Sequence, residues 1–221
     1  MKRLALGLVL SLAFASSAGA LSFGFDCIAG AAVPCGVGEA ALSVDITAGA
    51  GGEVLLTFSN SGPSAASVTG IYIDQGGLID RVSLVGGTGT DFRRGGRPRN
   101  LLGGGAISFH DDFRFTAKRP KAPNGVNGGE SLTIALTLRS GKTYADVISA
   151  LAGGSLRLGL VLSAADPACV GDDVEETNHK CTGDPGVAAF VNRPNPVPEP
   201  MPALLGGVAC LGLALIGRRR H

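Results

Sequence analysis

The chain has 221 residues, with 19 Lys and Arg against 18 Asp and Glu, so its formal net charge is +1. A charge so close to zero argues against a dedicated nucleic-acid-binding protein, which carries a marked basic excess. Glycine contributes 35 residues and only 17% of the residues are charged, a composition typical of many short strands joined by tight turns.

The first twenty residues have the three parts of a secretory signal peptide. Met1-Lys2-Arg3 is a positive beginning, residues 4–15 are apolar, and Ala18-Gly19-Ala20 supplies a small-residue cleavage site. The apolar stretch is too short and wrongly flanked for a lasting transmembrane helix. The sequence therefore predicts that residues 1–20 are removed and that the chain from Leu21 onward lies outside the cytoplasm.

Residues 21–194 are long enough for one domain with its own core, and their periodicity predicts strands. Two segments alternate strictly between apolar and other residues, which indicates a sheet with one buried face. Their apolar faces are Leu132, Ile134, Leu136 and Leu138 in residues 131–139, and Leu156, Leu158, Leu160 and Leu162 in residues 155–163. Weaker strands are predicted at residues 41–47, 53–59, 67–74, 78–85, 106–110 and 187–191.

One short helix is predicted at residues 144–151. Thr143 and Asp146 stand at capping-box spacing, with Asp in place of the usual Glu, and Gly153 can end the helix. The preceding Ser140-Gly-Lys-Thr143 is a tight turn and not a phosphate-binding loop, because Leu136 stands where that motif requires glycine. Many short antiparallel strands with one small helix favour a mainly β fold, a β-sandwich of the Ig-like or jelly-roll-like kind.

Four cysteines fall in the exported part, and a fifth, Cys210, lies near the C-terminus. An even number of cysteines in an oxidising compartment predicts disulfides, and four cysteines allow three connectivities. The local pairs Cys27–Cys35 and Cys169–Cys181 are favoured. Zinc is the alternative, but the spacings lack the paired C-x₂-C pattern.

Two charged clusters are candidate ligand sites. Residues 166–184 carry six carboxylates, for which calcium binding is an alternative to a solvated loop, although the EF-hand spacing is absent. A basic cluster could bind an anionic polysaccharide instead of remaining solvated; its members are Arg93, Arg94, Arg97, Arg99, Lys118, Arg119 and Lys121. Neutral-sugar binding is disfavoured, because there is no Trp and only two Tyr to supply stacking platforms.

Signatures of catalysis are few. The three histidines, His110, His179 and His221, form no H-E-x-x-H motif, and no G-x-S-x-G nucleophile elbow is present. A glycan hydrolase would need paired carboxylates, for which Glu39, Glu53 and Glu130 are the available candidates. The sequence therefore predicts no enzyme activity, no cofactor and no metal.

The C-terminal 27 residues have three parts in a fixed order. Val197-Pro198-Glu199-Pro200 is an extended, proline-rich stretch, residues 201–217 are uncharged, and Arg218, Arg219 and Arg220 precede His221. As a helix, residues 201–217 would reach about 25 Å, at the short end for crossing a bilayer, and arginines favour the cytoplasmic side. A buried core helix is the alternative.

This tail resembles the PEP-CTERM sorting signal of Gram-negative bacteria. The resemblance implies that the Pro198-Glu199-Pro200 tripeptide is recognised by an exosortase, a membrane-embedded cysteine enzyme that releases its substrates to the cell surface or exopolysaccharide matrix. It covers only residues 195–221 and therefore implies a destination, not an activity. Segments 69–74, 124–130 and 154–159 also resemble a set of PEP-CTERM proteins without assigned activity, and Asn60-Ser-Gly-Pro-Ser64 resembles turns of Ig-like bacterial surface domains.

Two functions are compatible with these features. The first is a non-enzymatic cell-surface or biofilm-matrix protein, held first at the inner membrane by its tail and then processed by exosortase. The second is a glycan-binding module or hydrolase acting on an exopolysaccharide. Expected partners are exosortase, the inner membrane and, as a further candidate, an anionic exopolysaccharide, but no nucleic acid.

Overall fold

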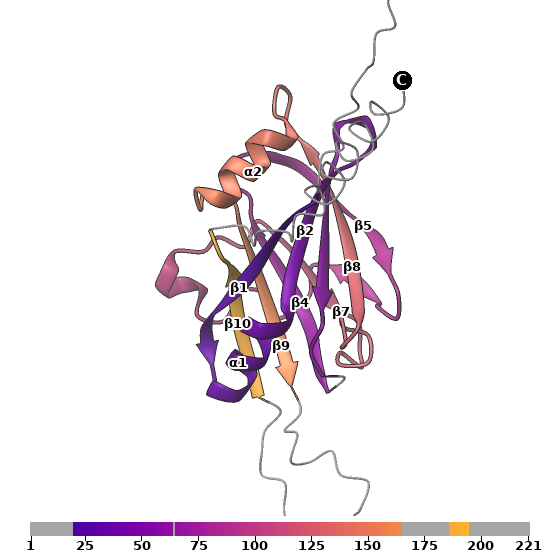
Figure 1. Ribbon diagram of the computed structural model, residues 1–221, viewed down its shortest axis with the longest axis vertical. Helices are drawn as coiled ribbons and strands as arrows, with labels where there is room; N and C mark the ends of the chain where they lie inside the picture. Colours follow the sequence, from indigo (N-terminus) through magenta and orange to yellow (C-terminus); the bar gives the residue numbers. More distant parts are fainter. Residues whose placement is uncertain (1–19, 64, 165–185, 195–221) are drawn as a thin grey trace, which may run out of the picture.

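The computed structural model describes residues 20–63, 65–164 and 186–194, which form one mainly β domain (Figure 1). The predicted signal peptide, the 166–184 acidic segment with Cys169 and Cys181, and the predicted sorting signal with Cys210 lie outside the described residues. The strands are β1 (Leu21–Gly30), β2 (Leu42–Ala48), β3 (Val54–Asn60), β4 (Ala66–Asp74), β5 (Ile79–Gly87), β6 (Phe92–Arg94), β7 (Phe113–Ala117), β8 (Glu130–Leu138), β9 (Arg157–Ala164) and β10 (Gly186–Asn192).

All ten strands belong to one antiparallel sheet in the order β5-β8-β3-β2-β1-β10-β9-β4-β7-β6. Strand β1 joins its two halves, because residues 21–24 pair with β2 and residues 25–30 pair with β10. The sheet curves round on itself, and its two edge strands, β5 and β6, contact each other. The predicted mainly β fold is confirmed, and its ten strands are hydrogen-bonded in one continuous order.

The concave side of this sheet encloses the main core. The alternating leucine faces predicted from the sequence point into it: Leu132, Ile134 and Leu136 of β8 are buried, as are Leu158, Leu160 and Leu162 of β9. Phe23, Phe58 and Phe190 add large aromatic side chains from β1, β3 and β10. Residues from both halves of the sheet therefore share one core, and burial of their apolar area stabilises the curved arrangement.

Two short α-helices accompany the sheet and lie near its opposite ends in Figure 1. The predicted helix is α2 (Tyr144–Ala152), and its capping box is present: Thr143 Oγ1 accepts from the Asp146 amide, and Asp146 Oδ2 accepts from the Thr143 amide. The sequence analysis missed α1 (Ala32–Ala41), which has no side-chain cap and contains two glycines. This helix is held by packing, since Gly38 lies directly against the ring of Phe190.

Most predicted strands are confirmed to within about two residues, but one is wrong. Residues 106–110 form no strand; the 3₁₀ helix η2 spans Gly104–Ile107, and Ser108 adopts a left-handed φ of 52°. A second 3₁₀ turn, η1, spans Ala50–Gly52. The sequence analysis also missed β1, β6 and β7. Among the described residues, none of the helices combines the length and apolar character needed to cross a membrane.

Candidate functional site

The long connection from β6 to β7 folds back over the convex face of the sheet. Tyr72 of β4, Val161 of β9 and Ala189 of β10 point outward there, and Leu101 and Phe109 of the connection cover them to form a second small core. Residues 66–74 of β4 are consequently buried on both faces of the strand. We call this connection, residues 95–112, the covering loop.

A buried ion pair anchors the covering loop. Asp74 and Arg157 are direct partners across β4 and β9, and Asp74 Oδ2 accepts hydrogen bonds from Arg157 Nε and Nη2. The same guanidinium donates to the carbonyls of Ile107 and Ser108, and it lies 5.2 Å from the centroid of the Phe109 ring. Asp74 also accepts from the His110 amide at 3.2 Å. The pair therefore holds the η2 turn and the residues just after it, through two donors of the Arg157 guanidinium and through Asp74 Oδ2.

One groove lies within the covering loop and a second borders it. The polar groove has a volume of about 460 Å³ and runs between the two arms of the loop above Arg114. Asp111 in this groove accepts from the Leu101 amide at 3.2 Å, and burial raises the pKa of its carboxyl above the ordinary value. Asp112 accepts from the amide of Gln75, the residue after β4, and so fastens the covering loop to the end of that strand.

The apolar groove lies on the other side of the covering loop and has a volume of about 320 Å³. Its floor is the convex face of β4, β9 and β10, and its walls are the covering loop and the segment after β7. The residues that line it are Thr69, Gly70, Tyr72, Pro98, Lys121, Ala122, Val161, Ser163 and Val187. Tyr72 donates from its hydroxyl to the Pro98 carbonyl at 3.1 Å, which fixes the loop wall to the floor.

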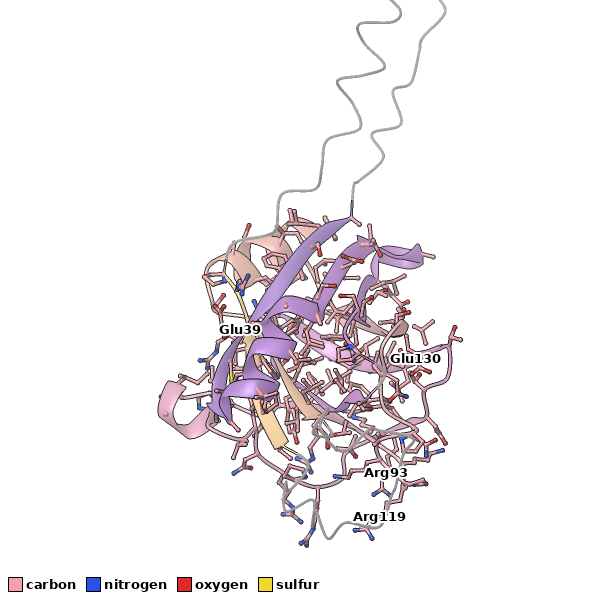
Figure 2. The ribbon with its side chains drawn as sticks, turned by 60° about the horizontal axis from the view of Figure 1, so that its bottom comes forward. Glu39, Arg93, Arg119 and Glu130 are labelled. Atoms are coloured by element: carbon pink, nitrogen blue, oxygen red, sulfur yellow. A yellow bond between two sulfur atoms is a disulfide. The ribbon has the colours of Figure 1, made fainter. Side chains whose placement is uncertain are left out.

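The structure brings the two halves of the predicted basic cluster together. Pairing of β6 with β7 places Arg93 opposite Thr116, so residues 93–94 lie beside the segment that carries Lys118 and Arg119. Lys121 Nζ donates to the Arg97 carbonyl at 2.9 Å and so connects the two loops. Figure 2 shows Arg93 and Arg119 at the same end of the domain. We call the surface formed by these seven predicted residues, together with Arg114, the basic surface.

Most of the basic surface has no counter-charge from the domain. Within residues 20–63, 65–164 and 186–194, Lys118 is its only member in a salt bridge, at 2.9 Å from Asp91. Arg114 donates to the carbonyls of Gly96 and Arg99, and Arg94 lies over the ring of Phe113. The other arginines of the surface, Arg93, Arg97, Arg99 and Arg119, are exposed. Their guanidinium groups therefore remain available for an external anion.

Three residues of this region, Arg114, Asp74 and Arg157, were not among the predicted site residues. Arg114 was overlooked because β7 was not predicted, although Phe113, Phe115 and Ala117 alternate with polar residues as a strand does. Asp74 and Arg157 are separated by 83 residues, and no local pattern in the sequence connects them.

The predicted Cys27–Cys35 disulfide is present and links β1 to α1. The carboxylates considered for hydrolysis do not form a pair. Glu39 accepts from the Cys27 amide, whereas Glu130 accepts from the amide and side chain of Asn127. Glu53 lies next to Thr137, at the opposite end of the β3–β8 pair from Glu130. Figure 2 likewise shows Glu39 and Glu130 far apart.

In the part of the chain that the structure describes, no group of His, Cys, Asp and Glu side chains is arranged to hold a metal ion. Comparison with known proteins finds no matching family model, no similar curated protein and no similar solved structure.

Proposed function

We propose that this protein is an exported, non-enzymatic β-domain that its C-terminal sorting signal delivers to the bacterial cell surface or exopolysaccharide matrix. The observation that carries the proposal is the disulfide between Cys27 and Cys35. Disulfides persist in oxidising compartments outside the cytoplasm and are rare inside it. This supports the export that the signal peptide predicts.

The position of the first strand supports the proposed processing at the N-terminus. Strand β1 begins at Leu21, whose register partner is Ile46, and Phe23 is fully buried. Cleavage after Ala20 would leave every described strand in the mature protein. A cleavage site further into β1 would remove core residues such as Phe23, which supports cleavage before β1.

The two ends of the described domain lie at the same end of the sheet, which suits a protein held by its tail. Phe25 pairs with Asn192, and the Arg193 amide donates to the Gly24 carbonyl at 2.8 Å. A tail beginning at residue 195 would therefore leave from the end where the mature chain begins.

The shared core of the two half-sheets supports the further interpretation of an Ig-like or jelly-roll-like sandwich.

A non-enzymatic role agrees with the part that the carboxylates in and beside the polar groove play in holding the covering loop. Asp74, Asp111 and Asp112 each accept hydrogen bonds that fix the covering loop. The alternative is a glycan-binding module, and the exposed arginines of the basic surface favour it over a hydrolase. The two roles are compatible, because a matrix protein can bind matrix polysaccharide.

The proposal is tested by mass spectrometry of both ends of the protein recovered from its native host. We expect the mature chain to begin at Leu21 and to lack Arg218 to His221. Replacement Glu199→Ala should leave export intact but trap the full-length membrane-bound form, because Glu199 adds nothing to membrane insertion. Asp80→Ala removes one negative charge from an exposed position of β5 and serves as the control.

Finding Arg218 to His221 still attached in surface-localised protein would show that the tail is an ordinary anchor. Finding the signal peptide uncleaved in the cytoplasm would contradict export itself.

A further inference from the structure

The basic surface and the apolar groove are parts of one region. Lys121 belongs to both, and Arg97 immediately precedes Pro98, which lines the groove. Residues 91–121 contain eight Lys and Arg but only three Asp, although the whole chain is nearly neutral. Positive charge is therefore concentrated around a groove whose floor carries Val161 and Val187.

The chemistry of this region defines its ligand. The groove volume of about 320 Å³ is within the range of small-ligand pockets. Its floor combines apolar groups with the hydroxyl-bearing residues Thr69 and Ser163, a combination suited to one face of a sugar ring. Val187 is 43% exposed, which is unusual for a valine in a strand at the centre of a sheet, and its burial by a ligand would be favourable.

The arginines are distributed and do not converge on one point. They come from β6, the covering loop and the segment after β7, so together they match repeated negative charges along a chain. Arginine binds carboxylate and sulfate groups through two parallel hydrogen bonds, which is stronger and more specific than a point charge. We infer that the apolar groove and the basic surface together bind an acidic polysaccharide, with one sugar ring over the groove and flanking carboxylate or sulfate groups on the arginines.

Other polyanions fit this region less well. Single-stranded nucleic acids need exposed aromatic platforms, whereas Tyr72 beneath the groove is fully buried. An anionic membrane is disfavoured by position, a step that rests on the proposed function. Val187, at the start of β10, lines the groove, and the strand then runs about 17 Å to Asn192, where the chain leads toward its tail. Arg119 is two residues from Lys121, which lines the groove, and Arg93 lies at the same end of the domain as Arg119 (Figure 2). In a tail-anchored chain both arginines therefore face away from the membrane.

The test is binding of the full-length chain, solubilised in a neutral detergent, to polygalacturonate, with neutral dextran as the comparison. We expect binding to polygalacturonate only, and we expect it to weaken as the NaCl concentration is raised. The double variant Arg93→Gln with Arg119→Gln should lose at least about tenfold in affinity, because it removes two charge-assisted contacts. The matched control is Arg81→Gln with Lys142→Gln, which removes the same charge from exposed positions outside the basic surface and should leave affinity unchanged.

The groove is tested separately from the charge around it. Val187→Glu places a carboxylate in the groove and should weaken polygalacturonate binding at least as strongly as the arginine variant. Val85→Glu is the control, because Val85 is 61% exposed on β5. Circular dichroism of each variant checks that the fold is retained, so loss of binding can be assigned to the surface.

Several outcomes would overturn the inference. Equal losses in the arginine variant and its control would show that only net charge matters. Tighter binding to single-stranded DNA or to phosphatidylglycerol vesicles than to polygalacturonate would assign the surface to another polyanion. Binding that appears only after the six carboxylates of residues 166–184 are neutralised would show that the basic surface serves this acidic segment of the same chain and not an external polysaccharide. None of these results depends on tail processing, so failure here is distinguishable from failure of the sorting proposal.

Discussion

Asp74 and Arg157 lie opposite each other on β4 and β9, and their ion pair fastens the covering loop to the sheet. The side chain of Asp74 is only 10% exposed and that of Arg157 only 22%. Because Arg157 also donates to two carbonyls of the loop, the pair connects strand to strand and sheet to loop at one point. The shape of both grooves therefore depends on a contact outside either of them.

Replacing Arg157 by Leu should lower the free energy of unfolding by about 3 kcal/mol, because it leaves a buried carboxylate without its partner. Arg193→Leu is the matched control, since it breaks the Arg193–Asp26 pair, whose side chains are 41% and 58% exposed. That change should cost about 0–1 kcal/mol. Urea unfolding of the two variants measures the difference, and equal losses would show that the Asp74 pair is no more important than a surface contact.

The Cys27–Cys35 disulfide should form in the exported protein, and peptide mapping under non-reducing conditions should detect it. It closes a loop with a sequence separation of 8 residues. Replacing both cysteines by Ala should therefore cost about 2.5 kcal/mol, chiefly because the unfolded chain regains conformational freedom. The same maps test the predicted Cys169–Cys181 pair, and a crossed link such as Cys27–Cys181 would contradict both assignments.

Two glycines of α1 should respond in opposite ways to the same substitution. A Cβ at Gly36 meets no atom within 4 Å, so Gly36→Ala should stabilise the helix by about 0.5–1 kcal/mol. A Cβ at Gly38 would overlap the Phe190 ring, so Gly38→Ala should destabilise the protein by about 1–3 kcal/mol. Thermal unfolding of the two variants measures both effects. A stabilising Gly38→Ala would show that α1 does not pack on β10 as described.

The buried phenol of Tyr72 should make the folded protein less stable at alkaline pH. Burial, with a smaller contribution from Asp111, raises the pKa of its phenol from 10.0 to about 12. The unfolded state therefore ionises first, so the stability that this group contributes is complete below pH 10 and is lost as the pH rises toward 12.

Spectrophotometric titration of tyrosinate should show a component near pH 12 that is absent from Tyr72→Phe. Tyr144 is the only other tyrosine and remains in both proteins. The free energy of unfolding of Tyr72→Phe should also fall less between pH 10 and pH 12 than that of the unsubstituted protein. Titration of both tyrosines at pH 10 would contradict the burial of Tyr72 beneath the covering loop.

Local patterns in the sequence determined the secondary structure where a single physical signal acted alone. Strict alternation located β8 and β9 and identified their buried leucine faces, because a strand exposes one side to solvent and one to the core. The Thr143 and Asp146 spacing located the start of α2, because the capping box satisfies free amides within four residues. The close pairing of Cys27 with Cys35 followed from their short separation.

The same signals failed where a tertiary contact overrode them. Ile107 and Phe109 alternate like strand residues, but Ile107 ends the 3₁₀ helix η2 and Phe109 lies just beyond it. Both side chains pack in the second core on the outer face of the sheet. Helix α1 has weak intrinsic propensity because of Gly36 and Gly38, and its packing against Phe190 allows it to form. Such contacts join segments far apart in the chain and leave no local periodicity.

The sequence by itself determined that this chain is mainly β, that one cysteine pair is local and that its arginines are concentrated between residues 93 and 121. The tertiary structure alone decided that the strands form one curved sheet, that the two basic segments share a surface, and that this surface borders a groove. The physical reason is distance along the chain. The Asp74–Arg157 contact joins residues 83 positions apart, and the pairing of β1 with β10 joins residues from opposite ends of the domain, such as Phe25 and Asn192. The free energy of such contacts depends on a geometry that no short stretch of sequence contains.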